Sequence, residues 1–120
     1  MKRRIKRFYD LLNQRKFQSC YELIDPRVRA KPSSVTLLQY QNSLARFLDR
    51  IGAVAVTDIH FDLHLDEPSA LNEGRDFAIG KTRWRDSAGV EREFIERWVH
   101  EDGKWYTRST GFLIPSDGGG

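Results

Sequence analysis

Two runs of alternating apolar and polar residues meet at Asp102-Gly103, within the stretch Phe94 to Phe112. Asp-Gly between such runs is the strongest short-range signal for a β-hairpin, because a type I′ turn needs positive φ at both central residues. A two-residue loop also sets which residues face each other. The expected pairs are His100 with Trp105, Trp98 with Thr107 and Glu96 with Ser109 on one face, and Val99 with Tyr106 and Arg97 with Arg108 on the other.

Each face of this hairpin mixes apolar and polar side chains. A sheet with one face in water alternates cleanly, so we expect one face to cover helices and the other to be covered in part by a second copy of the chain. The face with Glu96, Trp98 and Trp105 is placed inward, with the two tryptophans in diagonal contact. The pattern therefore predicts a homodimer that forms through the outer face of the sheet.

Apolar residues recur at helical spacing in the first half of the chain. The predicted helices run from Ile5 to Leu12, from Phe17 to Ile24, and from a cap at Ser33 or Ser34 to about Ile51. Asp25-Pro26 ends the second helix, because a residue before proline avoids the α region, and Gly52 ends the third. A small strand is expected between them, at Val28 to Ala30.

The second half of the chain changes to a period of two, which is typical of strands. The predicted strands are Thr57 to Leu65, Arg75 to Arg85, Val90 to His100 and the second arm of the hairpin, joined by a loop at 66–74 and a turn at 86–89. Helices followed by strands favour an α+β fold, with three N-terminal helices packed on an antiparallel sheet of four long strands. One domain is expected over residues 1–114, followed by a flexible tail at 115–120.

The net charge of +3 hides an asymmetry. Residues 1–32 hold ten Lys and Arg against three acids, whereas residues 33–120 hold ten against fourteen. This split fits either a basic arm for an acidic partner or a cationic helix that complements an acidic sheet of the same molecule or its neighbour. A nucleic-acid-binding face is usually basic throughout, so nucleic acid is not an expected partner.

Two further features bear on location. The N-terminus MKRRIKRFYD reaches Asp10 before an apolar run develops, so neither a secretory segment nor a membrane span is expected. The single cysteine, Cys20, excludes an internal disulfide and suits a reducing compartment. We therefore predict a cytoplasmic protein without a membrane partner. Cys20 lies at a buried position of a predicted helix and is interpreted as a small hydrophobic residue.

Three features together carry a family resemblance: the helix pair FYDLLNQRKFQSCYELIDP, a third helix before the first long strand, and the closing hairpin ERWVHEDGKWYTRSTGF. Over residues 5–114 the chain resembles the nuclear transport factor 2-like superfamily, which has a cystatin-like cone fold, in its branch of ketosteroid isomerase and polyketide-cyclase-like bacterial domains. The resemblance implies a strongly curved sheet wrapped on the helices, a pocket at the open end of the cone, and dimers through the outer sheet face. Catalytic members place an acid, a base or a tyrosine in that pocket, but no member's complete set matches this chain.

Glu96 is the acidic residue best placed for such a pocket. It shares the inward face with Trp98, Trp105 and Ser109, and a carboxyl group beside tryptophans can have a raised pKa and transfer protons. The alternative is a structural ion pair between Glu96 and an arginine such as Arg83. The remaining pocket candidates are Tyr9, Tyr21 and Trp84, and Tyr21 joins Glu96 as a candidate catalytic residue.

A period-two pattern places Asp58, His60, Asp62 and His64 on one face of a predicted strand. Imidazole and carboxylate ligands can hold a zinc or iron ion, so His60, Asp62 and His64 form an alternative metal site. The preferred interpretation is a solvated or dimer-facing surface whose acids pair with arginines of the neighbouring strand, because a metal also needs a ligand from another element. No cofactor is predicted.

These features leave three hypotheses for function. The first is a homodimeric cone-fold domain, not clearly catalytic, that binds a small, partly apolar ligand or an accessory peptide in its pocket. The second is a lyase, isomerase or hydrolase of the ketosteroid isomerase type, with Glu96 as proton shuttle and a tyrosine as hydrogen-bond donor. The third is an assembly module whose basic first helix docks on an acidic partner, with binding that weakens steeply with salt.

Overall fold

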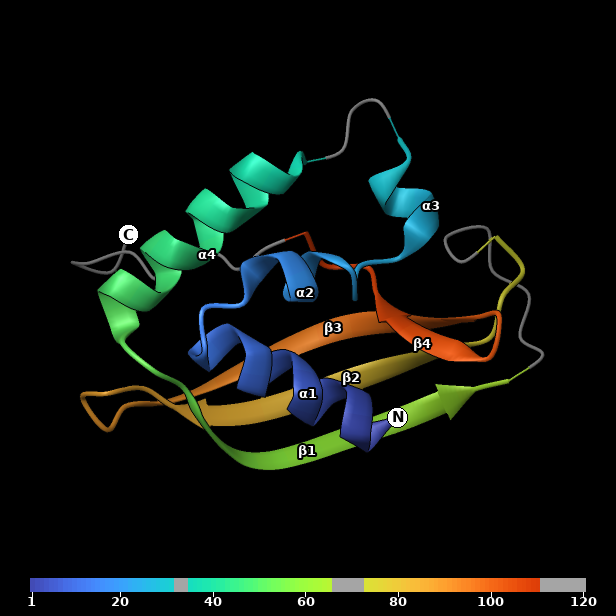
Figure 1. Ribbon diagram of the computed structural model, residues 1–120. Coiled ribbons are helices and arrows are strands. Elements are labelled where there is room, and N and C mark those ends of the chain that lie inside the picture. Colours follow the sequence, from blue (N-terminus) through green and yellow to red (C-terminus); the bar gives the residue numbers. More distant parts are fainter. Residues whose placement is uncertain (32–34, 66–72, 111–120) are drawn as a thin grey trace, which may run out of the picture.

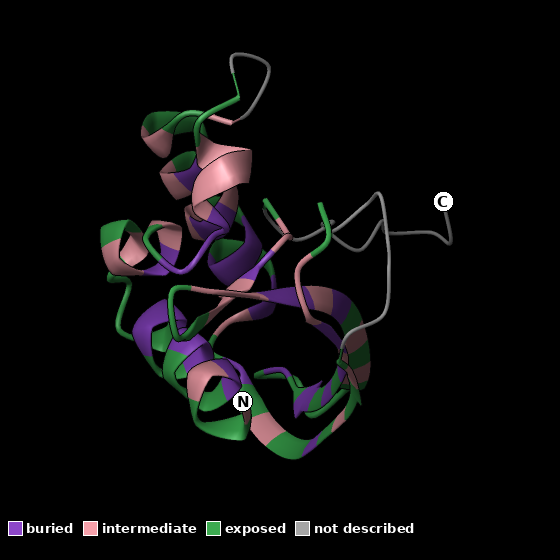
Figure 2. Cartoon of the chain, turned by 90° about the vertical axis from the view of Figure 1, so that its right-hand side faces the viewer, coloured by how far each residue is buried: buried purple, intermediate pink, exposed green. Residues whose placement is uncertain are grey.

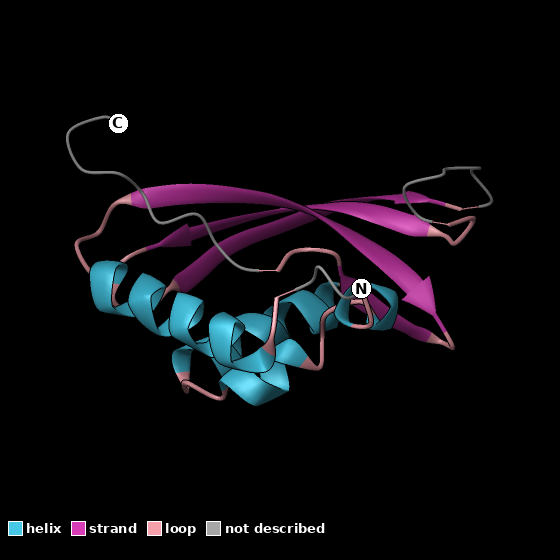
Figure 3. Cartoon of the chain, turned by 90° about the horizontal axis from the view of Figure 1, so that it is seen from above, coloured by secondary structure: helices cyan, strands magenta, loops and turns pink. Residues whose placement is uncertain are grey.

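The computed structural model describes residues 1–31, 35–65 and 73–110. Its helices are α1 (Lys2–Asn13), α2 (Phe17–Tyr21), α3 (Pro26–Arg29) and α4 (Leu37–Ile51), and its strands are β1 (Ala55–His64), β2 (Phe77–Arg85), β3 (Glu91–Glu101) and β4 (Lys104–Thr107). The helices lie on one face of the sheet (Figure 1, Figure 3). This arrangement confirms the α+β class. None of the helices in the described ranges is long and apolar enough to cross a membrane.

The short helix α3 corrects one detail of the sequence interpretation. Pro26 occupies the first helical position, where its missing N–H is not needed, and the side chain of Asp25 accepts a 3.0 Å hydrogen bond from the Arg27 N–H. Helix α2 already ends at Tyr21, so the predicted extension of the second helix to Ile24 and its end at Asp25-Pro26 were wrong, and the proline begins a helix instead. The predicted strand at Val28 to Ala30 was wrong, because this cap and proline start a helical turn instead.

Helix α4 begins and ends with recognisable caps. The Thr36 hydroxyl accepts from the Gln39 N–H at 3.2 Å, and the Gln39 side chain accepts from the Thr36 N–H at 2.9 Å, which is a capping box. The predicted serine caps at 33 and 34 lie outside the described residues, as do most of the loop at 66–74 and all of the tail at 115–120. Gly52 ends the helix with φ of 75°, as predicted.

The four strands form an antiparallel meander in the order β1-β2-β3-β4. Asp102 and Gly103 have φ of 50° and 80°, which is the backbone that a type I′ turn requires. The observed partners His100–Trp105, Trp98–Thr107 and Val99–Tyr106 confirm the predicted register. In the part of the chain described, this ladder ends at Thr107, earlier than the sequence pattern predicts.

Strand β4 ends where it meets the chain that leaves α2. Thr107 forms an isolated parallel bridge with Ile24. The Thr107 N–H donates to the Leu23 carbonyl at 2.9 Å, and the Asp25 N–H donates to the Thr107 carbonyl at 2.8 Å. The backbone N–H and carbonyl of Thr107 are thus bonded to the chain that follows α2, and the sheet and the helical layer are joined directly there.

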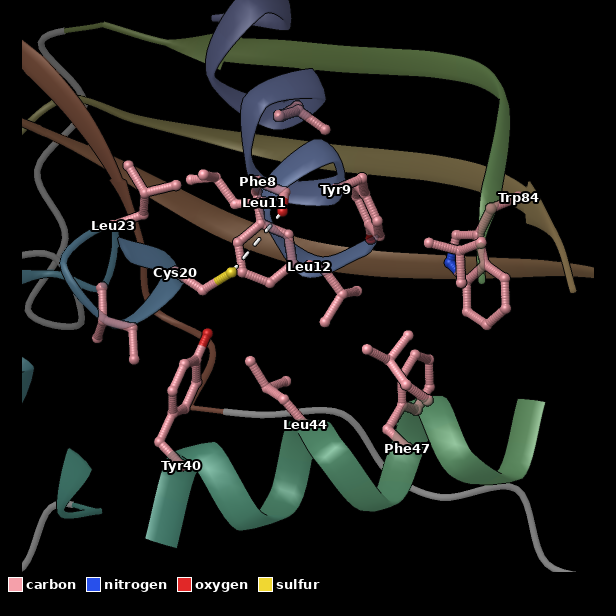
Figure 4. Packing of buried hydrophobic residues seen from close by; sticks show 14 of the residues in the cluster. Phe8, Tyr9, Leu11, Leu12, Cys20, Leu23, Tyr40, Leu44, Phe47 and Trp84 are labelled. Carbon is pink, nitrogen blue, oxygen red and sulfur yellow. Dashed lines mark hydrogen bonds between the residues drawn. The ribbon is translucent and has the colours of Figure 1, made fainter. Parts of the chain in front are cut away.

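The hydrophobic core fills the space between the helices and the covered face of the curved sheet, and buried and exposed residues alternate along the strands (Figure 2). Residues from α1 and α4 point toward each other across this space (Figure 4). The main contributors are Ile5, Phe8, Tyr9 and Leu12 of α1, Tyr40, Leu44, Phe47 and Leu48 of α4, and Ile59, Ala78, Trp84 and Trp98 of the sheet. The ring of Phe47 meets that of Trp84 edge to face, with centroids 5.6 Å apart.

The outer face of the sheet also buries apolar side chains, at the end where Phe77 opposes Val99. The Phe77 ring stacks with His64 at 4.5 Å, and the Arg97 guanidinium lies 4.6 Å from its centroid. Part of the mixed composition of this face is therefore explained within one chain. Ile95, on the same face, is 57 % exposed, and the homodimer stays a prediction.

Candidate functional site

Glu96 lies in the middle of β3, on the face of the sheet that the helices cover. Its partner in β2 is Gly80, and Ile5 of α1 and the Trp98 ring approach to 3.4 Å from the position that a Cβ of Gly80 would take. Glu96 is 6 % exposed. The proposed ion pair between Glu96 and Arg83 is wrong, because Arg83 lies on the outer face and binds Glu93 at 3.2 Å.

One oxygen of the Glu96 carboxyl group is held by Thr107. The Thr107 hydroxyl donates a 2.5 Å hydrogen bond to Glu96 Oε2 and accepts a 3.0 Å bond from the Ser109 N–H. Thr107 is itself buried and is tied to the chain after α2 by the two backbone bonds described above. The orientation of the acid is therefore set where β4 meets the helical layer.

Several buried polar atoms in this part of the core form no hydrogen bond of good geometry with the described residues, although Trp98 lies close to Glu96, and Thr82 and Trp84 lie close to Tyr9. They are Glu96 Oε1, the indole nitrogens of Trp84 and Trp98, and the hydroxyl of Thr82. Buried polar groups are nearly always hydrogen-bonded. A buried polar group without a hydrogen bond lowers the free energy of unfolding by about 1–3 kcal/mol. Such a concentration of unmet donors and acceptors is typical of a place where a bound molecule completes the hydrogen bonding.

Burial raises the pKa of Glu96 to about 7, because removal from water disfavours the charged form. Polar groups of Thr107, Trp98 and Ser109 act in the opposite direction by favouring the carboxylate, but their effect is smaller. A carboxyl group that titrates near neutral pH can both accept and release a proton. The site is therefore chemically suited to proton transfer as well as to binding.

Tyr9 is the tyrosine that the fold brings to this site. It projects from the buried side of α1 into the core (Figure 4) and is 1 % exposed. Burial is the largest cause of its strongly raised pKa, and the charge of Glu96 adds to it, whereas Thr82 and Trp84 favour the ionised form. The Tyr9 hydroxyl therefore stays protonated at neutral pH and can donate a hydrogen bond. Burial raises the pKa of Tyr40 in the same way, with smaller effects from Cys20 and Glu96.

The other predicted pocket residues have different roles. The Tyr21 hydroxyl donates to the Val35 carbonyl at 3.2 Å, and its ring packs against Tyr40. Trp105 is half-buried, and its ring contacts His100 at 5.0 Å. Ser109 contributes its backbone N–H to Thr107. From the predicted set, Trp98 and Ser109 lie beside Glu96, Tyr9 lies within reach of its charge, and Trp84 contacts Tyr9 rather than Glu96.

The alternative metal site is not assembled. His60 and Asp62 are both exposed, with Nε2 and Oδ1 3.5 Å apart, and His64 stacks on Phe77. Asp58 faces Arg83 across the strand pair. Over residues 1–31, 35–65 and 73–110, no group of three or more His, Cys, Asp or Glu side chains is arranged to hold a metal ion.

An ion network around Asp25 was not anticipated from the sequence. Asp25 is fully buried, and Arg75 binds both of its oxygens, at 2.8 Å and 2.7 Å. Arg108 binds the same carboxylate at 3.1 Å, and Arg75 reaches Glu101 at 2.5 Å. Burial by itself raises the pKa of Asp25, but the hydrogen bonds and charges of Arg75, with smaller contributions from Arg27 and Arg108, outweigh it and lower the pKa. The network joins the start of α3 to the ends of β2, β3 and β4.

Two site residues, Thr107 and Thr82, were also missed. The hairpin register correctly placed Thr107 opposite Trp98, but pairing alone does not say that its hydroxyl turns toward Glu96. Thr82 can be placed on this face only when β2 is aligned with β3, where it opposes Phe94.

No model of a protein family matches this chain, and no curated protein matches its sequence. Function is therefore inferred from the residues around Glu96.

Proposed function

We propose that this chain is a cone-shaped domain of the nuclear transport factor 2-like type that binds a small, partly apolar molecule beside Glu96. The observation that carries the proposal is the buried Glu96 carboxyl group, whose Oε1 has no partner among the described residues. Trp98 supplies apolar surface and an indole N–H donor beside Glu96, and Tyr9 and Trp84 extend the apolar surface farther along the core. A ligand with an apolar body and one oxygen atom matches this combination.

The Glu96 site is better suited to a small molecule than to an accessory peptide. Glu96 is enclosed by α1 and by the joint between β4 and the chain after α2, so an extended backbone has no open edge along which to lie. Because Glu96 is 6 % exposed, a ligand reaches it only when the covering side chains move. We expect slow association for this reason.

A second candidate function is acid–base catalysis at the same site, by a lyase, isomerase or hydrolase. The observation that favours it is the pKa of Glu96, which burial raises to about 7. The Glu96 carboxylate would accept a proton from a carbon next to a carbonyl group and return it as the acid. A hydrogen bond from the Tyr9 hydroxyl to the carbonyl oxygen would stabilise the negative charge that develops there. Tyr9 takes the role that the sequence alone assigned to Tyr21.

Binding can be tested with 2-acetonaphthone and 2-ethylnaphthalene, which have the same shape and differ in the carbonyl oxygen. The chain has three tryptophans, and their indole N–H resonances can be followed by NMR. We expect 2-acetonaphthone to shift the resonances of Trp84 and Trp98 more than that of Trp105, and 2-ethylnaphthalene to bind less tightly. Shifts centred on Trp105, or no saturable shift with either compound, would refute the site.

Catalysis can be tested separately in the same samples. Deuterium exchange at the methyl group next to the carbonyl of 2-acetonaphthone reports the proton transfer directly. We expect exchange in the wild type to rise as Glu96 ionises near pH 7, and to be lost in Glu96→Gln, while Glu93→Gln on the outer face behaves as the wild type. Binding without exchange would remove the enzyme candidate and leave the binding function intact.

We also infer that the chain forms a homodimer through the outer face of the sheet and works in a reducing compartment such as the cytoplasm. The first inference is supported by exposed Ile95 together with Phe77 and Val99, which give the outer face an apolar component. The second is supported by Cys20, the only cysteine of the chain, which is buried and whose pKa burial raises to about 12. A thiol in that state is a poor nucleophile and is protected from oxidation.

A further inference from the structure

The exposed side of α1 borders a polar hollow that is separate from the Glu96 site. This hollow has a volume of about 300 Å³ and lies between α1, α2 and β4. Its polar lining consists of Arg4, Arg7, Ser19, Glu22, Lys104 and Tyr106. Three of these side chains are cations and one is an acid, so the wall carries a positive charge.

Arg4 is held in place at this hollow. Its Nε donates a 2.9 Å hydrogen bond to the Trp105 carbonyl, and its guanidinium lies 5.3 Å from the centroid of the Tyr106 ring. Among the described residues, this side chain forms no other hydrogen bond than the one from its Nε. An arginine fixed through Nε loses little entropy when its terminal NH₂ groups bind an anion.

The cations beside Arg4 are not paired with the carboxylates of the described residues, although Glu22 lines the same hollow and Asp10 lines the neighbouring one. Arg7 and Lys104 form no ion pair with any described residue, and the same holds for Arg3, Lys6 and Lys16, which line a neighbouring hollow of about 540 Å³. Several arginines elsewhere do have carboxylate partners: Arg15, Arg27, Arg75, Arg83, Arg92 and Arg108. Arg85 on β2 also forms no ion pair with a described residue, but it does not line either hollow, whereas Arg7, Lys104 and the cations of the neighbouring hollow lie close together.

The charges in this hollow also repel each other. Burial is the main cause of the lowered pKa of Arg4, and the nearby charge of Arg7 lowers it further, although Tyr106 acts in the opposite direction. A bound anion would remove that repulsion and restore the balance of charge. A dianion suits three cations better than a single carboxylate does.

We propose that this hollow binds the phosphate group of a small, soluble phosphorylated molecule. Arg4, Arg7 and Lys104 would contact the phosphate oxygens, with the Tyr106 hydroxyl as a further donor. Glu22 and Ser19 line the other part of the hollow and suit hydroxyl groups of the same ligand, because a carboxylate accepts hydrogen bonds and a serine both donates and accepts them. The proposal does not depend on the function proposed for Glu96.

The test uses calorimetric titration with inorganic phosphate, glucose 6-phosphate and glucose. We expect glucose 6-phosphate to bind more tightly than inorganic phosphate, and glucose not to bind. Arg7→Gln and Lys104→Gln should each weaken glucose 6-phosphate binding at least tenfold, since both side chains are free of ion pairs with described residues and their loss should leave the fold intact. Arg85→Gln removes the same charge at an exposed position of β2 and should leave binding unchanged.

Three outcomes would overturn the proposal. One is that wild-type protein binds neither phosphate compound at millimolar concentration. Another is that Arg85→Gln weakens binding as much as Arg7→Gln does, because the effect would then reflect net charge alone. The third is that vesicles containing phosphatidic acid bind the chain while glucose 6-phosphate does not, since the phosphate would then belong to a lipid surface.

Discussion

The hydroxyl of Thr107 donates a 2.5 Å hydrogen bond to Glu96 Oε2, across the pair of strands that the Asp102-Gly103 turn joins. Thr107 directly opposes Trp98. Glu96 is the neighbour of Trp98 on the same face of β3, so the Thr107 hydroxyl reaches it diagonally across the strand pair. Its backbone is bonded to Leu23 and Asp25. A local turn and a contact with the helical layer thus combine to orient one buried acid, whose second oxygen forms no hydrogen bond of good geometry with the described residues.

The stability of the folded chain should depend on the charge of Glu96. The pKa of this group is about 7 in the folded chain, above its ordinary value of 4.5. Between these pH values the folded state binds more protons than the unfolded state, so the free energy of unfolding falls as the pH rises. We expect a loss of about 3 kcal/mol between pH 4.5 and pH 8. Urea unfolding of the wild type and Glu96→Gln over this range isolates the effect, because the variant should lack it. Parallel pH profiles for the two proteins would contradict the prediction.

Removal of the Thr107 hydroxyl should leave the Glu96 carboxylate without its hydrogen bond. We expect Thr107→Val to lower the free energy of unfolding at pH 8 by about 1–3 kcal/mol and to raise the pKa of Glu96 further. Thr107→Ser keeps the hydroxyl and serves as the matched control. NMR titration of the Glu96 carboxyl carbon measures the pKa, and an unchanged value in Thr107→Val would show that the bond is unimportant.

The ion network around Asp25 should contribute strongly to stability only as a whole. Arg75→Met leaves Asp25 buried with fewer donors, and we expect a loss of about 3–5 kcal/mol. Arg83→Met, which removes the exposed pair with Glu93, should cost about 0–1 kcal/mol. The double variant Asp25→Asn, Arg75→Met should recover part of the loss. Equal effects of Arg75→Met and Arg83→Met in urea unfolding would be inconsistent with this assignment.

The hairpin turn should depend on glycine at position 103. Gly103 has φ of 80°, and a side chain in that region costs about 1–2 kcal/mol, so we expect Gly103→Ala to destabilise the chain by that amount. Gly80 offers a contrast within the sheet, since a Cβ there meets its neighbours at 3.4 Å, an ordinary contact. Gly80→Ala should be neutral or stabilising by about 0.5 kcal/mol. Thermal unfolding compares the two variants, and the opposite order would be decisive against the turn assignment.

A dimer through the outer sheet face should be sensitive to Ile95. We expect light scattering to give twice the monomer mass of 14.0 kDa for the wild type, and Ile95→Lys to shift the chain toward the monomer because a buried lysine in an interface is costly. Leu38→Lys on α4, where the leucine is 66 % exposed, is the control and should remain dimeric. A monomeric mass for the wild type at micromolar concentration would refute the predicted dimer.

Local patterns predicted the elements well and the site in part. The hairpin register, the end of α4 at Gly52 and the inward placement of Trp98 and Glu96 follow from turn chemistry and periodicity, which act over a few residues. The role of Pro26 was not predicted, because α2 ends at Tyr21 without it and the proline begins α3, which depends on the cap that Asp25 provides. Tyr9 rather than Tyr21 lies within reach of the charge of Glu96, because the rotation of α1 against the sheet, which periodicity does not specify, decides which tyrosine lies near that acid.

The sequence by itself determined the α+β order of the elements, the four-stranded meander and the face on which Glu96 lies, since alternation and turn residues encode these locally. Only the tertiary structure decided that Thr107 would bind Glu96, that Asp25 would meet Arg75 and Arg108, and that the cations of α1 would border a hollow with Lys104. The contacts of Asp25 and the hollow join residues far apart in the chain, and the Thr107 contact depends on the distant backbone bonds of Thr107 to Leu23 and Asp25. Their distances are set by how the helical layer docks on the sheet, which depends on the packing of the whole core.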